Sequence, residues 1–170
     1  AQSTHLLIAT ACAQITLQVP TITWPTPTAI SYGTVLGAAQ LNATASVPGV
    51  FLYSSTTDTV LSAGLQTITA TFTPTDTANY SVATASVTLS ITPASLMITP
   101  VDATRAYGLA NPAFTYLATG FVNGETSAVL SGAPAITTAA GLASAPGSYA
   151  VTSTTGTLSS SNYSFVFRSA

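Results

Sequence analysis

Charged residues are scarce in this sequence. Only 4% of the 170 residues are Asp, Glu, Lys or Arg, and lysine is absent altogether. Without a basic patch, nucleic acid and acidic membrane surfaces find no counter-charge on the chain, so we expect neither as a partner. A cytosolic protein with so few charges would have difficulty staying soluble. The composition therefore favours a secreted, extracellular or cell-surface protein.

Cysteine and histidine occur once each, as Cys12 and His5. A single cysteine cannot form an internal disulfide, so core packing and sheet hydrogen bonds must hold the fold together. One histidine provides no base beside a nucleophile, and the acidic residues are scattered singly rather than at metal-ligating spacings. Polar residues and proline interrupt the apolar stretches, so no segment is long enough for a membrane helix. We predict a protein that is not an enzyme and has no cofactor or metal.

Threonine and serine are abundant and alternate with Val, Ile, Leu and Ala. This pattern is typical of strands that have one face in water. Disorder is disfavoured because 47% of the residues are hydrophobic and the net charge is only −2. Gly or Pro recurs about every ten residues and marks turns. We predict an all-β fold of two tandem immunoglobulin-like β-sandwich domains with an extra N-terminal β-strand.

The predicted boundaries give an extended strand at 1–19 and domains at 20–93 and 94–170. Short strands separated by turns at this spacing suit a Greek-key sandwich. The predicted strands are 21–24, 41–45, 50–54, 66–73, 80–83 and 85–92 in the first domain, and 96–99, 114–119, 133–137, 147–152 and 163–167 in the second.

Two internal matches support a repeat. Residues 30–33 match residues 105–108, and both segments end in Tyr-Gly. Residues 77–81 match residues 160–164, and both contain Asn-Tyr-Ser.

These motifs also carry a resemblance to known families. The first half, with Trp24, Tyr32-Gly33 and the run at 69–80, resembles a bacterial Ig-like surface repeat. The second half, with Tyr107-Gly108, residues 120–125 and residues 146–149, resembles the MBG-type repeat of the same surface proteins. The resemblance covers residues 20–168. It implies spacers in large adhesins and secreted polymers rather than catalysts.

The N-terminal segment suggests a mechanism of assembly. Its odd-numbered residues are apolar at period two, and thirteen extended residues exceed the about five to six of a typical strand. Residues 13–24 also resemble the end of one repeat and the start of the next. These apolar residues are Leu7, Ala9, Ala11, Ala13, Ile15, Leu17 and Val19.

The second domain has only seven residues after Tyr163, whereas the first has a further strand after Tyr80. We therefore expect the second domain to lack its last strand. Our hypothesis is that residues 7–19 of one chain complete the second domain of another, next to Phe165, Val166 and Phe167, in a head-to-tail homopolymer. Alternatively, the N-terminal strand extends the sheet of its own first domain, and residues that follow Ala170 in a longer parent chain supply the last strand of the second.

Two other functions stay open. The chain could consist of spacer repeats from a large adhesin, or it could be a carbohydrate-binding module in which Trp24 stacks on a surface polysaccharide. The start Ala1-Gln2 suits a mature chain after signal-peptide removal, and a trimmed chain would look the same.

The remaining candidate residues have structural or weak assignments. Trp24 is expected to plug a sandwich end, and Tyr80 and Tyr163 are expected to act as tyrosine corners. Sequons place candidate glycosylation sites at Asn42, Asn79 and Asn162.

Overall fold

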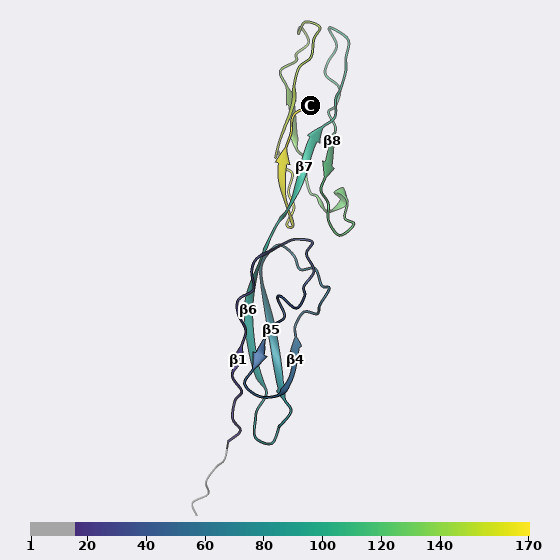
Figure 1. The fold of residues 1–170 in the computed structure, drawn as a ribbon. Helices are drawn as coiled ribbons and strands as arrows, with labels where there is room; N and C mark the ends of the chain where they lie inside the picture. Colours follow the sequence, from purple (N-terminus) through teal and green to yellow (C-terminus); the bar gives the residue numbers. More distant parts are fainter. Residues whose placement is uncertain (1–15) are drawn as a thin grey trace, which may run out of the picture.

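The computed structural model describes residues 16–170, which form two lobes arranged end to end (Figure 1). We call residues 16–92 the N-terminal lobe and residues 94–170 the C-terminal lobe. Within the described residues, the regular elements are strands apart from a single 3-10 turn at Ser127–Val129. The all-β prediction is confirmed, and the strands form several small sheets.

The N-terminal lobe is built around a four-stranded sheet of order β2-β6-β5-β4. Strand β2 runs parallel to β6, and the other neighbours are antiparallel. A separate two-stranded sheet pairs β1 with β3. The strands are β1 (Ile22–Thr23), β2 (Ile30–Ser31), β3 (Thr44–Ala45), β4 (Gly49–Tyr53), β5 (Gly64–Pro74) and β6 (Ala83–Thr92).

The period-two pattern explains the two long strands β5 and β6. Outward positions carry Thr and Ser almost throughout, whereas inward positions carry Ile68, Phe72 and Leu89, which are all 0–1% exposed. Alternate side chains of a strand point to opposite faces, so this sequence gives each strand one dry face and one wet face.

The C-terminal lobe contains a three-stranded sheet of order β11-β7-β8 and a β9–β10 hairpin. β11 runs parallel to β7, after which residues 169–170 pair antiparallel with the start of β10. The strands are β7 (Ala94–Pro100), β8 (Tyr116–Thr119), β9 (Ala135–Thr138), β10 (Val151–Thr154) and β11 (Tyr163–Phe167).

Only Pro93 separates β6 from β7, so the last strand of one lobe leads directly into the first strand of the other. The hydrophobic core is continuous across this connection. Leu89 and Ile91 of β6 belong to the same buried cluster as Ala94 and Leu96 of β7.

Several predicted strand boundaries differ from the structure, and the predicted strand at 80–83 is not formed. Tyr80 makes a single bridge to Gln18, and strand β6 begins only at Ala83. β10 begins at Val151 rather than at residue 147. Strand β2 was not predicted, because two residues preceded by a proline-rich stretch give no alternating pattern.

Candidate functional site

The face between the lobes holds a network of polar contacts. Tyr32 of the N-terminal lobe donates a hydrogen bond to Oε1 of Glu125 at 2.7 Å. Tyr163 of β11 donates to Oε2 of the same carboxylate. The two tyrosine rings meet edge to face with centroids 5.5 Å apart. One carboxylate therefore connects both lobes, and we call Tyr32, Glu125 and Tyr163 the tyrosine junction.

Further contacts surround the tyrosine junction. The Ala63 amide donates to Oδ1 of Asn162 at 3.0 Å, and the Val122 amide donates to the Tyr163 hydroxyl at 3.1 Å. Phe121 packs edge to face on Tyr163 with ring centroids 5.7 Å apart. Backbone, aromatic and charged contacts thus fix the same interface.

Local sequence creates this geometry. Glu125 follows a turn in which Asn123 and Gly124 have φ of 56° and 70°, which Asn and Gly tolerate better than other residues. Gly33 has a φ of 95°, and a Cβ there would lie 2.8 Å from a methyl carbon of Val122. In the Tyr-Gly pair at 32–33, Tyr32 therefore supplies the hydroxyl that binds Glu125, and Gly33 allows the backbone to approach Val122 closely.

The tyrosine junction also shifts the acid–base behaviour of its phenols. The hydrogen bond to the Glu125 carboxylate, followed by burial, raises the pKa of Tyr32 above its ordinary value. Burial, followed by the Glu125 hydrogen bond, raises the pKa of Tyr163. Both causes stabilise the neutral phenol, which is the form that can donate.

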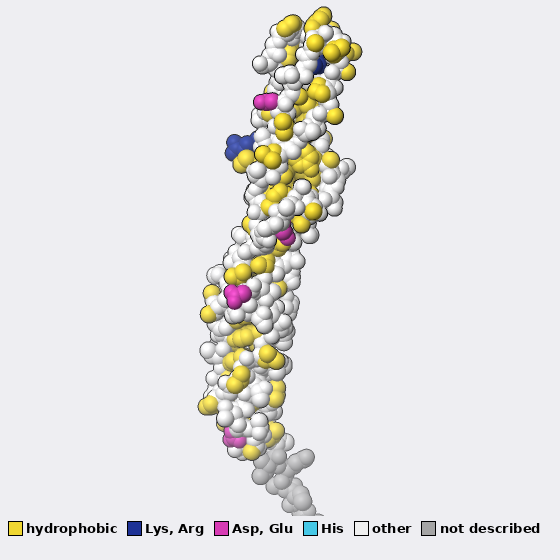
Figure 2. Space-filling model, turned by 90° about the vertical axis from the view of Figure 1, so that its right-hand side faces the viewer, with side chains coloured by type: hydrophobic (Ala, Val, Ile, Leu, Met, Phe, Trp, Pro, Cys, Tyr) yellow, Lys and Arg dark blue, Asp and Glu magenta, His cyan; other side chains and the backbone are white. Residues whose placement is uncertain are grey.

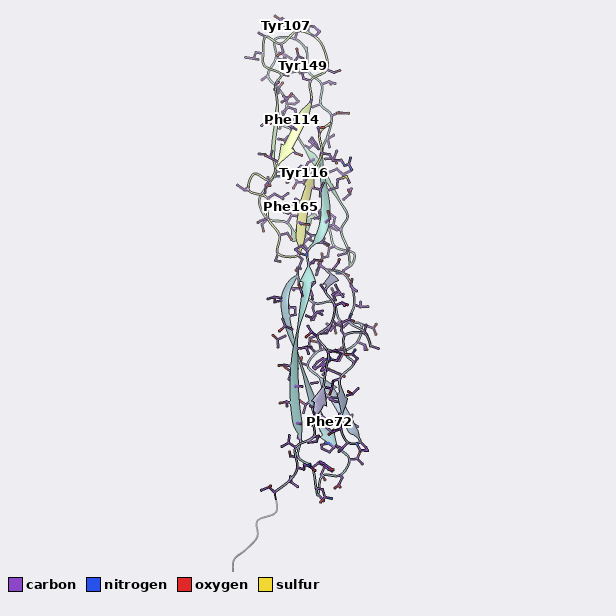
Figure 3. All side chains as sticks on the ribbon, turned by 60° about the vertical axis from the view of Figure 1, so that its left-hand side comes forward. Phe72, Tyr107, Phe114, Tyr116, Tyr149 and Phe165 are labelled. Atoms are coloured by element: carbon purple, nitrogen blue, oxygen red, sulfur yellow. The ribbon has the colours of Figure 1, made fainter. Side chains whose placement is uncertain are left out.

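The second site is a hollow at the far end of the C-terminal lobe. Its volume is about 630 Å³, and it is lined by two segments, at 102–114 and 138–151, together with Ala170. Arg105 joins these segments, because its Nε donates to Asn111 at 2.7 Å and its guanidinium also donates to the Gly141 carbonyl. Tyr107 and Tyr149 stand at this end of the molecule (Figure 3).

The structure describes part of the predicted donor strand. Leu17 and Val19 are 49% and 67% exposed, while Gln18 exchanges backbone hydrogen bonds with Asn79 and Ser81. The predicted donor residues outside the described part of the chain are Leu7, Ala9, Ala11, Ala13 and Ile15, as are His5 and Cys12.

The predicted acceptor residues lie on β11, which is paired with β7 along one edge. Phe165 and Phe167 are half-buried and their ring centroids are 6.4 Å apart, whereas Val166 is exposed. The acceptor role of these residues stays a prediction.

The other candidate residues have the following surroundings. Trp24 is half-buried, packs edge to face on Tyr53 at 5.3 Å and donates from Nε1 to the Gln40 carbonyl. Tyr80 is half-buried, and its backbone bridges Gln18. Asn42 and Asn79 are exposed, whereas Asn162 is half-buried in the face between the lobes.

Charged side chains are few and scattered on the surface shown in Figure 2. Residues 16–170 hold no group of three or more His, Cys, Asp or Glu side chains placed to bind a metal. Among the same residues, no helix has the length and hydrophobicity needed to cross a membrane.

Sequence reasoning did not identify the tyrosine junction. It matched the Tyr-Gly pair at 32–33 with the pair at 107–108, but it gave Tyr32 and Glu125 no role. The available signal was Glu125, the only glutamate in a chain with four acidic residues, because a charge that is buried generally needs partners.

Comparison with known proteins identifies part of the chain. Residues 96–170 match the family model described as MBG domain (YGX type). Neither the curated proteins nor the solved structures give a significant match to the chain. The matched residues contain the Tyr107-Gly108 pair, Glu125 and Tyr163. Residues 96–170 are therefore an MBG domain of the YGX type, a bacterial Ig-like surface repeat.

Proposed function

We propose that this chain is a non-catalytic structural unit of the bacterial cell exterior that assembles head to tail into a filament. In this proposal residues 20–93 and 94–170 are two Ig-like β-sandwich domains. Residues 7–19 of one copy add as a strand to the C-terminal lobe of the next. The chain is its own principal partner and works outside the cell.

The tyrosine junction is the observation that carries the structural role. A rod made of several lobes stays straight only if the lobes cannot rotate against each other. Here the lobes share the connection β6–Pro93–β7, a common core and the bridging Glu125 carboxylate. Domain interfaces within chains are often looser and more polar than this. The fixed joint supports a rigid spacer or fibre better than a binding module.

The two ends of the rod support assembly between copies. Gln18 lies at the end of the N-terminal lobe opposite the joint, and the hollow lies at the far end of the C-terminal lobe. A contact between opposite ends is heterologous, and such contacts form open filaments when they do not close into rings. Strand addition would supply main-chain hydrogen bonds and alternate apolar side chains.

Spacer repeats within a larger adhesin are the second candidate. The direct passage from β6 through Pro93 into β7 favours it, because the same connection can join any number of lobes in one chain. A carbohydrate-binding role has less support, since Trp24 is engaged with Tyr53 and Gln40.

Electron microscopy and light scattering of purified chains test the filament. We would compare the full chain with a variant lacking residues 1–19 and a control lacking only residues 1–4. Filaments from the full chain and the control, with monomers from the longer truncation, are expected. Monomers from all three would overturn the filament and leave the spacer function.

A further inference from the structure

The N-terminal lobe shows how the end of β6 is held in place. Residues 88–91 lie antiparallel to residues 64–67 of β5, and Ile91 and Thr92 also lie parallel to Ile30 and Ser31 of β2. The inward side chains Leu89 and Ile91 are 0% and 3% exposed. The end of this strand therefore has a sheet neighbour on each edge and a dry face toward the core.

Two residue pairs of the C-terminal lobe match pairs between β5 and β6. Thr152 pairs with Ser169 as Thr69 pairs with Ser86, and the Val151–Ala170 pair corresponds to Ile68–Val87. The two Asn-Tyr-Ser motifs, at 79–81 and 162–164, are separated by the same number of residues as these pairs, so the alignment needs no gap. Residues 147–150 therefore correspond to 64–67, and by the Tyr-Gly match residues 105–106 correspond to 30–31.

These two edges line the same hollow at the far end of the C-terminal lobe. Among the described residues, neither 103–107 nor 147–150 belongs to a β-ladder. Tyr107, Phe114 and Tyr149 contribute aromatic surface to the lining. The hollow thus combines two backbone segments that have no ladder partner with aromatic side chains, and β-strand addition uses both kinds of contact.

The internal joint also indicates which residues fit there. Gln18 pairs with Tyr80 as Ala94 pairs with Tyr163, so the residues before Gln18 correspond to those before Ala94. Ile15 then takes the place of Ile91, Ala13 that of Leu89 and Cys12 that of Thr88. Ile15 and Ala13, which correspond to the core-facing residues Ile91 and Leu89, are both apolar.

We propose that residues 12–16 of a second copy lie in this hollow, antiparallel to residues 147–150 and parallel to 105–106, so that the joint between copies repeats the joint within the chain. This inference rests on the proposed head-to-tail assembly and fixes its register. Tyr107, in the position of Tyr32, then faces the incoming copy.

The strand must come from another molecule. Gln18 is hydrogen-bonded to Asn79 and Ser81, just before β6, and the ten residues of β6 alone span roughly 33 Å toward the other lobe. The six residues from Gln18 back to Cys12 reach at most about 22 Å. A chain therefore cannot fill its own hollow.

Cysteine cross-linking tests this register in the full chain. Cys12 is the only thiol and should lie opposite Ala150, as Thr88 lies opposite Thr67. Directly opposed residues of antiparallel strands have Cα atoms about 4.5–5.5 Å apart, which a disulfide can span. Mild oxidation of Ala150→Cys should give a ladder of dimers, trimers and longer chains on a non-reducing gel.

Two controls separate register from chance collision. Ser90→Cys places a thiol on the exposed face of the N-terminal lobe and should cross-link about tenfold less, because no assembly holds it near Cys12. Adding Cys12→Ser to the Ala150→Cys chain should abolish the ladder, since one thiol per chain cannot link more than two copies.

The remaining outcomes distinguish this inference from the function beneath it. A ladder from Ser148→Cys instead of Ala150→Cys would overturn the proposed register and show that the strand is shifted by two residues. Filaments by microscopy without a ladder from either variant would overturn this site and leave the head-to-tail function standing. Neither filaments nor ladder would overturn both, and an intrachain disulfide in a monomer would overturn strand exchange.

Discussion

At the scale of single residues, Glu125 shows how one charge organises an almost uncharged molecule. Its two carboxylate oxygens accept from Tyr32 and Tyr163, whose positions lie on different lobes. Hydrogen bonds to a charged group contribute about 1.5–3 kcal/mol each, more than those between neutral groups. Both oxygens of the half-buried carboxylate thus have hydrogen-bond donors, and the same carboxylate links the two lobes.

The tyrosine junction makes the stability of the molecule sensitive to alkali. Both phenols have a raised pKa in the folded chain, so the fold retains protons that the unfolded chain loses. Their contribution is fully present below the ordinary tyrosine pKa of about 10 and is lost as pH rises through the higher folded pKa. Urea unfolding followed by circular dichroism from pH 7 to 12 should show this decline.

A double variant, Tyr32→Phe with Tyr163→Phe, is the matched control for the alkaline decline. It removes the two titrating hydroxyls and keeps the rings, so its stability should be lower at pH 7 and should fall less steeply above pH 10. An unchanged slope would place the alkaline sensitivity elsewhere in the chain.

At the scale of elements, strand β6 serves both lobes. Its inward residues Val87, Leu89 and Ile91 complete the core of the N-terminal lobe, and its end continues through Pro93 into β7. β6 also has neighbours on both edges, with β5 on one side and the two residues of β2 on the other. Loss of packing in β6 should therefore affect both lobes.

Leu89→Ala tests the importance of β6. Leu89 is 0% exposed, so its truncation should lower the free energy of unfolding by about 2–5 kcal/mol. The neighbouring Thr88→Ala changes the exposed face of the same strand and should stay within about 0.5 kcal/mol. Chemical denaturation of both variants measures the difference, and equal losses would show that the strand is not anchored by its inward face.

At the scale of the whole molecule, the two lobes are joined by a shared hydrophobic cluster and by close contacts between their facing ends. Gly33 is central to this contact, since its φ of 95° and its approach to Val122 both exclude a side chain. A larger residue there must move one lobe away from the other.

Gly33→Val should therefore loosen the rod. A left-handed backbone costs a residue with a side chain roughly 1–2 kcal/mol, and the Val122 contact adds to that cost. Small-angle X-ray scattering should show a more flexible particle, and proteases should cleave near Pro93. Gly37→Ala, where a Cβ would meet nothing within 4 Å, is the control and should keep the wild-type profile. An unchanged profile for Gly33→Val would mean that the joint does not depend on this contact.

Much of the molecule followed from the sequence itself. Alternation of Thr and Ser with apolar residues determined that the chain is all-β, and it located β5 and β6 because a strand buries every second side chain. The MBG-type resemblance of the second half rested on linear motifs, and the family match at 96–170 confirms it. The role of residues 7–19 and glycosylation at the three sequons stay predictions.

Only the tertiary structure decided how the lobes are joined. Tyr32 and Glu125 lie 93 residues apart, and no local pattern pairs a phenol with a carboxylate at that distance. Strand β2 also went unpredicted, because two residues hold a strand conformation only through their parallel pairing with β6. Composition and periodicity are properties of neighbouring residues and could determine the strands. The joint and the hollow depend on contacts between distant segments, which exist only once the chain has folded.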